Sequence, residues 1–171
     1  VDEQLQTTAP NIFAIGDCIG GPLLAHKAMH EGILAVEGIA GIGGGKLNAQ
    51  RIPNCTYCEP QVASLGLTEE HAREQDLKIK VGRFPFQANG KALALSSSEG
   101  LVKVIADSGT GEILGVHIIG PEATELIAEA GSAMTLEATP EAIAHVVHAH
   151  PTLSEAFAEA NLAILGRAVH L

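Results

Sequence analysis

Apolar and polar residues alternate in several short runs over the last two thirds of the chain. Runs of this kind, rich in β-branched residues and bounded by turn residues, predict strands that are buried on one face. The polar, glycine-containing segment 107–112 lies between two of them and is typical of a β-hairpin. The strands expected from this pattern cover residues 54–57, 62–68, 79–86, 101–106 and 113–119.

Between and after these strands the apolar residues recur at three- and four-residue intervals, which predicts helices. One helix begins at Pro121 and has one apolar face, made of Ala123, Leu126, Ile127, Ala130 and Met134. Further helices are expected at 69–75 (capped by Thr68), at 89–95, from 139 to before His150, and at 152–165. Strands followed by helices indicate an antiparallel sheet with helices on one side, which is an α+β domain.

The first part of the chain shows a different pattern. An apolar run over residues 11–17 predicts one strand that ends in Gly16-Asp17. A helix follows and continues to about Ala40, with Pro22 at its first position. One side of this helix carries an apolar stripe, made of Ala25, Met29, Ile33, Val36 and Ala40.

A glycine-rich link, residues 41–45, ends this helix. We therefore place a domain boundary near Asn48, with a strand-helix piece (1–48) before the α+β domain (49–171). Ligands often bind at the C-terminal ends of strands in α/β sheets, but the pattern alone also allows Asp17 to be merely solvated. Cys18, which follows it, is expected to be a small buried residue.

The composition excludes several classes of protein. Of the 171 residues 46% are hydrophobic and only 3% aromatic, so the core must consist of Ala, Val, Ile and Leu. The net charge of −10 disfavours a nucleic-acid-binding surface. No apolar run is long enough to span a membrane, and no signal peptide is recognisable. Three cysteines do not suggest a disulfide-stapled secreted domain. We therefore expect a protein of the cytoplasm or the mitochondrial matrix.

The residues best suited to catalysis lie near the C-terminus, at positions 148–155. His150 precedes Pro151, and Glu155 follows shortly after. An imidazole titrates near neutral pH, and a nearby carboxylate can orient it and favour its protonated form, as in a general base. Thr152 and Glu155 also have the spacing of a capping box that begins a helix. Spacing alone favours the capping box, because such boxes are common and His-Glu dyads are rare.

Residues 148–162 resemble the C-terminal signature of the dihydrolipoamide dehydrogenases, which are FAD- and NAD-dependent flavin disulfide reductases. In that family the His before Pro is the acid-base catalyst and the Glu after Leu-Ser orients it. The resemblance implies these roles for His150 and Glu155. Glutathione reductases usually continue Ser-Ser-Glu-Glu after a related His-Pro-Thr, and mercuric reductases typically lack the His. Ala149 and Leu153-Ser154-Glu155-Ala156 favour the lipoamide enzymes.

Two N-terminal segments resemble flavin-contacting parts of the same superfamily. Residues 7–17 are similar to its second FAD-binding motif, in which the Asp, here Asp17, hydrogen-bonds the ribityl chain of FAD. Residues 21–28 are similar to a helix start whose backbone amides point at the pyrimidine end of the flavin. The residues concerned are Leu23, Leu24, Ala25 and His26. A helix N-terminus suits the negative charge that a reduced flavin gathers at that end.

The rest of the chain resembles the dimer-interface domain of the family, most clearly over residues 83–89 and 114–121. It departs at Cys58-Glu59-Pro60-Gln61, where the family often has Thr-x-Pro-Glu. The resemblance implies a homodimer in which His150 serves the disulfide and flavin of the partner subunit.

The activity implied for the complete enzyme is oxidation of dihydrolipoamide with NAD⁺ through FAD, on the lipoyl domains of 2-oxo acid dehydrogenase complexes. Two alternatives remain, a non-catalytic dimerisation module and a related flavin reductase with another thiol or disulfide substrate. The intact dyad favours an enzyme. The Gly-rich dinucleotide fingerprint, the redox cysteines and the NAD domain of the family are missing from this sequence. We therefore expect a part of a longer enzyme.

Two further patterns have simpler explanations than chemistry. Cys55 and Cys58 have CxxC spacing, but residues three apart on a strand point to opposite faces and no second CxxC follows. His145, His148 and His150 are close in sequence. No carboxylate or Cys lies at ligand spacing on their helical face, so no metal site is expected.

We expect this chain by itself to be colourless, without bound FAD or dehydrogenase activity, because the Gly-rich turn that approaches the pyrophosphate is absent. The domain from about Arg51 has its own sheet and helices and should fold. Apolar surface on its helices should make it a homodimer. An absorbance scan and analytical ultracentrifugation measure both properties, and a yellow monomer would contradict both.

Overall fold

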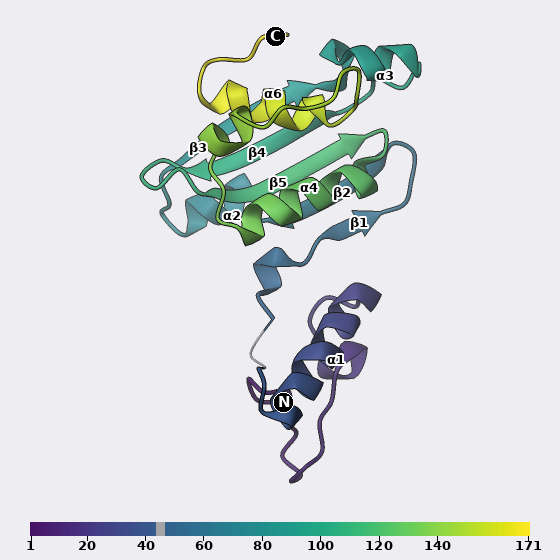
Figure 1. Cartoon of the computed structure of the whole chain (residues 1–171), viewed down its shortest axis with the longest axis vertical. Coiled ribbons are helices and arrows are strands. Elements are labelled where there is room, and N and C mark those ends of the chain that lie inside the picture. Colours follow the sequence, from purple (N-terminus) through teal and green to yellow (C-terminus); the bar gives the residue numbers. More distant parts are fainter. Residues whose placement is uncertain (44–46) are drawn as a thin grey trace. The chain divides into compact units, whose positions relative to one another are not determined.

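The computed structural model describes residues 1–43 and 47–171, which form two compact units, Val1–Ile52 and Pro53–Leu171 (Figure 1). Gly44 and Gly45 of the expected link lie outside the described residues. None of the helices in the described ranges has both the length and the apolar content needed to cross a lipid bilayer.

A five-stranded antiparallel sheet with the order β1-β2-β5-β4-β3 is the frame of the second unit. All five strands lie where the alternation of apolar residues predicts them. Asp107 closes the expected hairpin between β4 and β5, because its carboxylate accepts hydrogen bonds from the N–H groups of Gly109 and Thr110 at 2.8 and 2.7 Å. The strands are β1 (Asn54–Thr56), β2 (Gln61–Gly66), β3 (Ile79–Pro85), β4 (Leu101–Asp107) and β5 (Ile113–Gly120).

Two helices cover one face of this sheet (Figure 1). Helix α4 (Ala123–Thr135) packs on β2 and β5, and α6 (Glu155–Ile164) packs on β3 and β4. The predicted apolar face of α4 is confirmed, since four of its five residues are buried and Leu126 packs against the core. The shorter helices are α2 (Glu69–Glu74), η3 (Phe86–Ala88), α3 (Gly90–Ala94) and α5 (Pro140–Ala144). The antiparallel α+β fold expected from the sequence is thereby confirmed.

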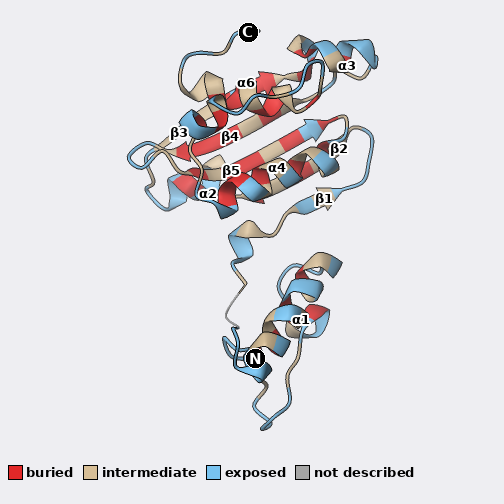
Figure 2. Ribbon diagram, in the orientation of Figure 1, coloured by how far each residue is buried: buried red, intermediate tan, exposed pale blue. Residues whose placement is uncertain are grey.

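The register of the sheet places side chains of neighbouring strands next to one another, in rows that run across the sheet. Phe84, Val102 and Ile118 form one such row with Ala63, and all four are fully or almost fully buried. These buried positions give the alternating stripes along the strands in Figure 2. Because successive residues of a strand point to opposite faces, the core lies between the sheet and the helices α4 and α6.

The opposite face of the sheet is polar at its centre. Arg83, Lys103 and His117 alternate with the buried positions, and Lys103 pairs directly with both of the others across the strands. Glu69, at the start of α2, forms ion pairs with Arg83 and Lys103. The short helix α2 therefore lies against this second face, so the helices are not confined to one side.

Gly82 allows α6 to approach the sheet closely. It lies on β3, on the core face, two residues before Phe84. A Cβ atom at this position would be 1.9 Å from the carbonyl oxygen of Ala160 and 2.7 Å from Cγ1 of Ile164. The absence of a side chain therefore sets the distance between β3 and α6.

The first unit contains η1 (Gly16–Ile19), α1 (Ala25–Ala40) and η2 (Ala49–Arg51). The predicted strand over residues 11–17 is wrong. This segment forms one isolated bridge, Gln6 with Phe13, because no neighbouring strand is available along its length within the described part of this unit. Cys18 is exposed, which also corrects the expectation that it is buried.

Helix α1 begins later than predicted. Gly20 and Gly21 both have positive φ (79° and 76°), so the chain turns before the helix, and its first residue is Ala25 and not Pro22. Its C-terminus is as expected, with Gly41 in the left-handed conformation at φ 68°.

The predicted apolar stripe of α1 is not its buried face. Met29, Ile33 and Val36 are 69%, 54% and 64% exposed. Lys27 and Glu31 are buried instead, together with Ala35, because the turn at η1 packs on that side of the helix.

Replacing Gly82 by Ala is expected to destabilise the second unit by about 1–3 kcal/mol or more, because the new methyl group overlaps the backbone of α6. The matched control is Gly90→Ala at the start of α3, where no atom lies within 4 Å of the new Cβ. The control should change stability by less than about 1 kcal/mol. Urea unfolding followed by circular dichroism measures both, and equal midpoints would contradict the role of Gly82.

Candidate active site

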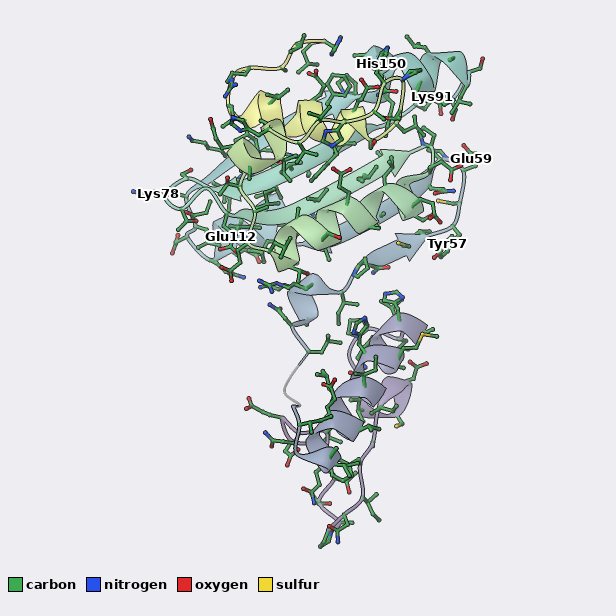
Figure 3. The ribbon with its side chains drawn as sticks, in the orientation of Figure 1. Tyr57, Glu59, Lys78, Lys91, Glu112 and His150 are labelled. Atoms are coloured by element: carbon green, nitrogen blue, oxygen red, sulfur yellow. The ribbon has the colours of Figure 1, made fainter. Side chains whose placement is uncertain are left out.

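His150 and Glu155 form a hydrogen-bonded pair between the loop after α5 and the first residue of α6. His150 Nδ1 lies 2.9 Å from Glu155 Oε1. The imidazole is 75% exposed, whereas the carboxylate is only 23% exposed. The His150–Pro151 peptide bond is cis. Figure 3 shows His150 at the end of the sheet where α3 lies.

The ring of His150 is thus held by one nitrogen and presented to solvent by the other. Among the described residues, Nε2 has no hydrogen-bond partner. A carboxylate on Nδ1 fixes the orientation of an imidazole and stabilises its protonated form. This geometry suits a group that accepts a proton from, and returns it to, a molecule in solvent.

The second carboxylate oxygen of Glu155 binds the backbone of the loop that carries His150. Oε2 accepts a hydrogen bond from the backbone N–H of Thr152 at 2.8 Å. The hydroxyl of Thr152 does not cap the helix but donates to the carbonyl of Ala149 at 2.7 Å, and α6 begins at Glu155 with Ser154 before it. The predicted helix start at Thr152 is therefore wrong, and only the carboxylate half of the capping box exists.

The environment of Glu155 favours its ionised form. Partial burial raises the pKa of this carboxyl, but the N–H of Thr152 and the imidazole of His150 outweigh that effect, so the pKa lies below its usual range. The carboxylate is therefore available to His150 over the whole neutral pH range.

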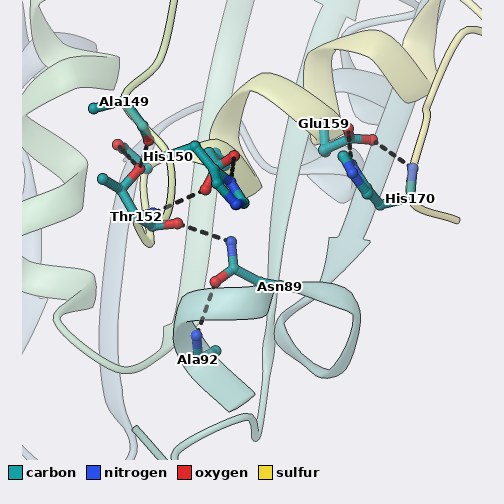
Figure 4. A network of polar contacts seen from close by, with 9 residues as sticks. Asn89, Ala92, Ala149, His150, Thr152, Glu159 and His170 are labelled. Carbon is teal, nitrogen blue, oxygen red and sulfur yellow. Dashed lines mark hydrogen bonds and ion pairs between the residues drawn. The ribbon is translucent and has the colours of Figure 1, made fainter. Parts of the chain in front are cut away.

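A single buried amide ties the loop to α3. The side chain of Asn89 is only 3% exposed. Its Oδ1 accepts from the N–H of Ala92 at 2.9 Å, and its Nδ2 donates to the carbonyl of Thr152 at 3.0 Å (Figure 4). The sequence reveals Asn89 only as a residue that begins a helix. Its second bond joins residues 63 positions apart, which local sequence patterns do not encode.

The other histidines of this region have partners of their own. His148, two residues before His150, places Nε2 2.7 Å from Glu129 Oε1 of α4 and has a side chain only 8% exposed. His145 Nδ1 lies 2.7 Å from the carbonyl of Glu141. Across residues 1–43 and 47–171 no group of His, Cys, Asp and Glu has the arrangement of a metal site.

The CxxC cysteines lie in different environments. Cys55 is half-buried against the core, where burial raises the pKa of its thiol, and Cys58 is exposed beyond the end of β1. Both are free thiols.

The residues expected to contact FAD lie in the first unit, in η1 and at the start of α1. Asp17 is exposed, directly after Gly16. At the helix start Leu23 is 67% exposed, Ala25 is exposed, and Leu24 and His26 are half-buried. Leu24 has extended backbone, and its side chain makes no capping bond to the first turn of α1. A carboxylate that can accept from hydroxyls and an uncapped helix N-terminus therefore occur in one small unit.

Comparison with known proteins agrees with this geometry. Residues 52–161 match the family described as pyridine nucleotide-disulphide oxidoreductase, dimerisation domain, and residues 1–32 match pyridine nucleotide-disulphide oxidoreductase. The chain belongs to the pyridine nucleotide-disulphide oxidoreductases and contains their dimerisation domain.

Curated relatives include the dihydrolipoyl dehydrogenase of Bacillus subtilis, 51% identical over 99% of this chain and 36% of the relative. The mitochondrial dihydrolipoyl dehydrogenase of Caenorhabditis elegans is 53% identical over 99% of this chain and 34% of the relative. The chain thus spans about a third of the length of the curated relatives it matches.

Solved structures share the fold at lower identity. LpdA from Mycobacterium tuberculosis superimposes with a TM-score of 0.89 at 26% identity, over 94% of this chain and 35% of that one. The HOCl-induced flavoprotein disulfide reductase RclA from Escherichia coli gives a TM-score of 0.84 at 27% identity, over 94% and 37%.

Glu155→Gln should leave stability at pH 7 within about 0.5 kcal/mol of the original, because a Gln oxygen still accepts from the Thr152 N–H, whereas Glu155→Ala should cost about 1 kcal/mol. The wild-type carboxyl has a lowered folded-state pKa. Its contribution is therefore complete above its unfolded pKa and is lost as the pH falls through the folded one. Urea unfolding between pH 7 and pH 3 tests this. A Gln variant with the same acid dependence as the wild type would rule out a contribution from Glu155.

Proposed function

We propose that this chain provides the acid-base dyad and the dimerisation domain of a dihydrolipoyl dehydrogenase, which oxidises dihydrolipoamide with NAD⁺. The observation that carries the proposal is the 2.9 Å pair of His150 and Glu155. It lies in a chain about half identical to dihydrolipoyl dehydrogenases from bacteria and animals. The exposed imidazole can accept a proton from a substrate, and the partly buried carboxylate can hold the imidazole in place.

In this reaction His150 accepts a proton from a thiol of dihydrolipoamide at Nε2. The thiolate so formed attacks a protein disulfide, because the thiolate and not the thiol is the nucleophile. Glu155 stabilises the imidazolium through Nδ1 and keeps the ring in place. One sulfur of the disulfide leaves as a thiolate, and loss of the proton from Nε2 to solvent then resets His150 for the next turnover.

FAD supplies the electron transfer between the dithiol and NAD⁺ in such an enzyme. We propose that residues 1–48 are part of its FAD-binding domain. The exposed carboxylate of Asp17 would accept hydrogen bonds from ribityl hydroxyls, and backbone N–H groups around Leu23, Leu24, Ala25 and His26 would bind the pyrimidine end of the flavin. The positive end of the α1 dipole stabilises negative charge there.

We further propose that the enzyme is a homodimer, with the surface of residues 49–171 as its interface and lipoyl domains of 2-oxo acid dehydrogenase complexes as substrates. Each dyad then serves the disulfide and flavin of the partner subunit. Relatives occur in bacteria and in mitochondria, so the proposed location is the cytoplasm or the mitochondrial matrix.

A related flavin disulfide reductase with another thiol or disulfide substrate is the second candidate. The likeness to RclA, which extends over 94% of this chain, supports it. The identity is about half as high as that to the dihydrolipoyl dehydrogenases, and the dyad serves either substrate class.

In the complete enzyme, His150→Gln should lower dihydrolipoamide oxidation by about 10²–10⁴-fold, the usual cost of losing a general base. Electron transfer from NADH to an artificial dye needs no thiol deprotonation and should be spared. Glu155→Gln should lower turnover without changing the melting temperature. Steady-state assays with the two acceptors measure this, and equal loss of both activities in His150→Gln would assign the imidazole a structural role.

A further inference from the structure

A buried ion pair lies on α1, in the first unit. Lys27 and Glu31 are only 6% and 4% exposed. Lys27 Nζ lies 3.0 Å from Glu31 Oε1 and 3.2 Å from Oε2. Lys27 is in the first turn of the helix, where the helix dipole disfavours a cation. Burial of a charge at this place therefore needs compensation from specific partners.

The compensation comes in part from the backbone of Gly16. Its N–H donates to Glu31 Oε2 at 2.8 Å, and its carbonyl accepts from Lys27 Nζ at 3.3 Å. Gly16 has a φ of +75°, and a Cβ there would be only 3.2 Å from Cβ of Ala28. The turn at η1 therefore packs closely on α1, and both the N–H and the carbonyl of Gly16 bind side chains of that helix.

The bond to Lys27 fixes the peptide plane that joins Gly16 to Asp17, because the accepting carbonyl belongs to that peptide. A peptide group is planar, so its orientation also fixes the position of the Asp17 Cα and the N–Cα bond from which that residue continues. Asp17 is the exposed acid proposed to bind the ribityl hydroxyls of FAD. The buried charges therefore anchor the backbone from which its carboxylate extends.

We propose that Lys27 and Glu31 are positioning residues for FAD, which hold the Gly16–Asp17 peptide so that the Asp17 carboxylate faces the ribityl chain. The inference rests on the proposed function, since it needs FAD at Asp17. Stability alone does not account for the pair, because well-packed apolar residues of similar volume often replace a buried ion pair without loss. Such residues supply no hydrogen-bond partners for Gly16.

The test compares two double variants of the complete flavoenzyme. Lys27→Met with Glu31→Leu removes the charges and both bonds to Gly16. Lys27→Met with Glu31→Gln also removes the charges, but the Gln amide can accept from the Gly16 N–H and donate to its carbonyl. The Leu variant should bind FAD at least about tenfold more weakly than the Gln variant, as expected for the loss of such hydrogen bonds. The fluorescence of released flavin measures FAD affinity, and the melting temperature of the apoprotein measures stability.

A double-mutant cycle with Asp17→Asn separates positioning from general stability. In the wild-type background Asp17→Asn should weaken FAD binding, and in the Leu background it should have little further effect. Equal FAD affinity of the two double variants, or a full effect of Asp17→Asn in both backgrounds, overturns the inference while the proposed function stands. A wild-type enzyme that holds no FAD overturns both.

Discussion

The contact between β3 and α6 is the constraint on which the candidate site depends. Gly82 leaves space for the carbonyl of Ala160, so α6 lies directly on the sheet. The first residue of that helix is Glu155, which orients His150. The dyad is therefore positioned by a glycine on a strand, through the packing of a helix, although Gly82 has no part in the chemistry.

The loop that carries His150 is exposed, yet buried or half-buried polar groups from three helices hold it. Asn89 beside α3 binds its backbone, Glu129 of α4 binds the neighbouring imidazole of His148, and Glu155 of α6 binds both His150 and Thr152. Exposed ion pairs contribute little to stability. The value of this arrangement lies in orientation, since a general base is effective only when its ring is held at a fixed angle and remains accessible.

The first unit contains a buried ion pair on its helix. Its helix buries Lys27 and Glu31 and exposes Met29, Ile33 and Val36. Buried charges are tolerated because they pair with one another and with the two polar groups of Gly16. In the second unit a partly buried carboxylate at the start of a helix binds His150, and in the first unit buried charges on a helix bind the backbone next to Asp17.

The sequence by itself determined the strands and α4 of the second unit through their apolar patterns, and the starts of α2, α3 and α5 through the side-chain caps Thr68, Asn89 and Thr139. It did not determine where α5 ends or where α6 begins. It also identified His150 and Glu155, which lie five residues apart. Tertiary structure alone decided which face of α1 is buried, since Lys27 becomes an interior residue only when Gly16 packs on it. It likewise decided that Glu155 serves both His150 and Thr152, and that Asn89 reaches across 63 residues to the same loop. Periodicity reports burial along one element, whereas a polar bond between distant elements depends on how the whole chain packs.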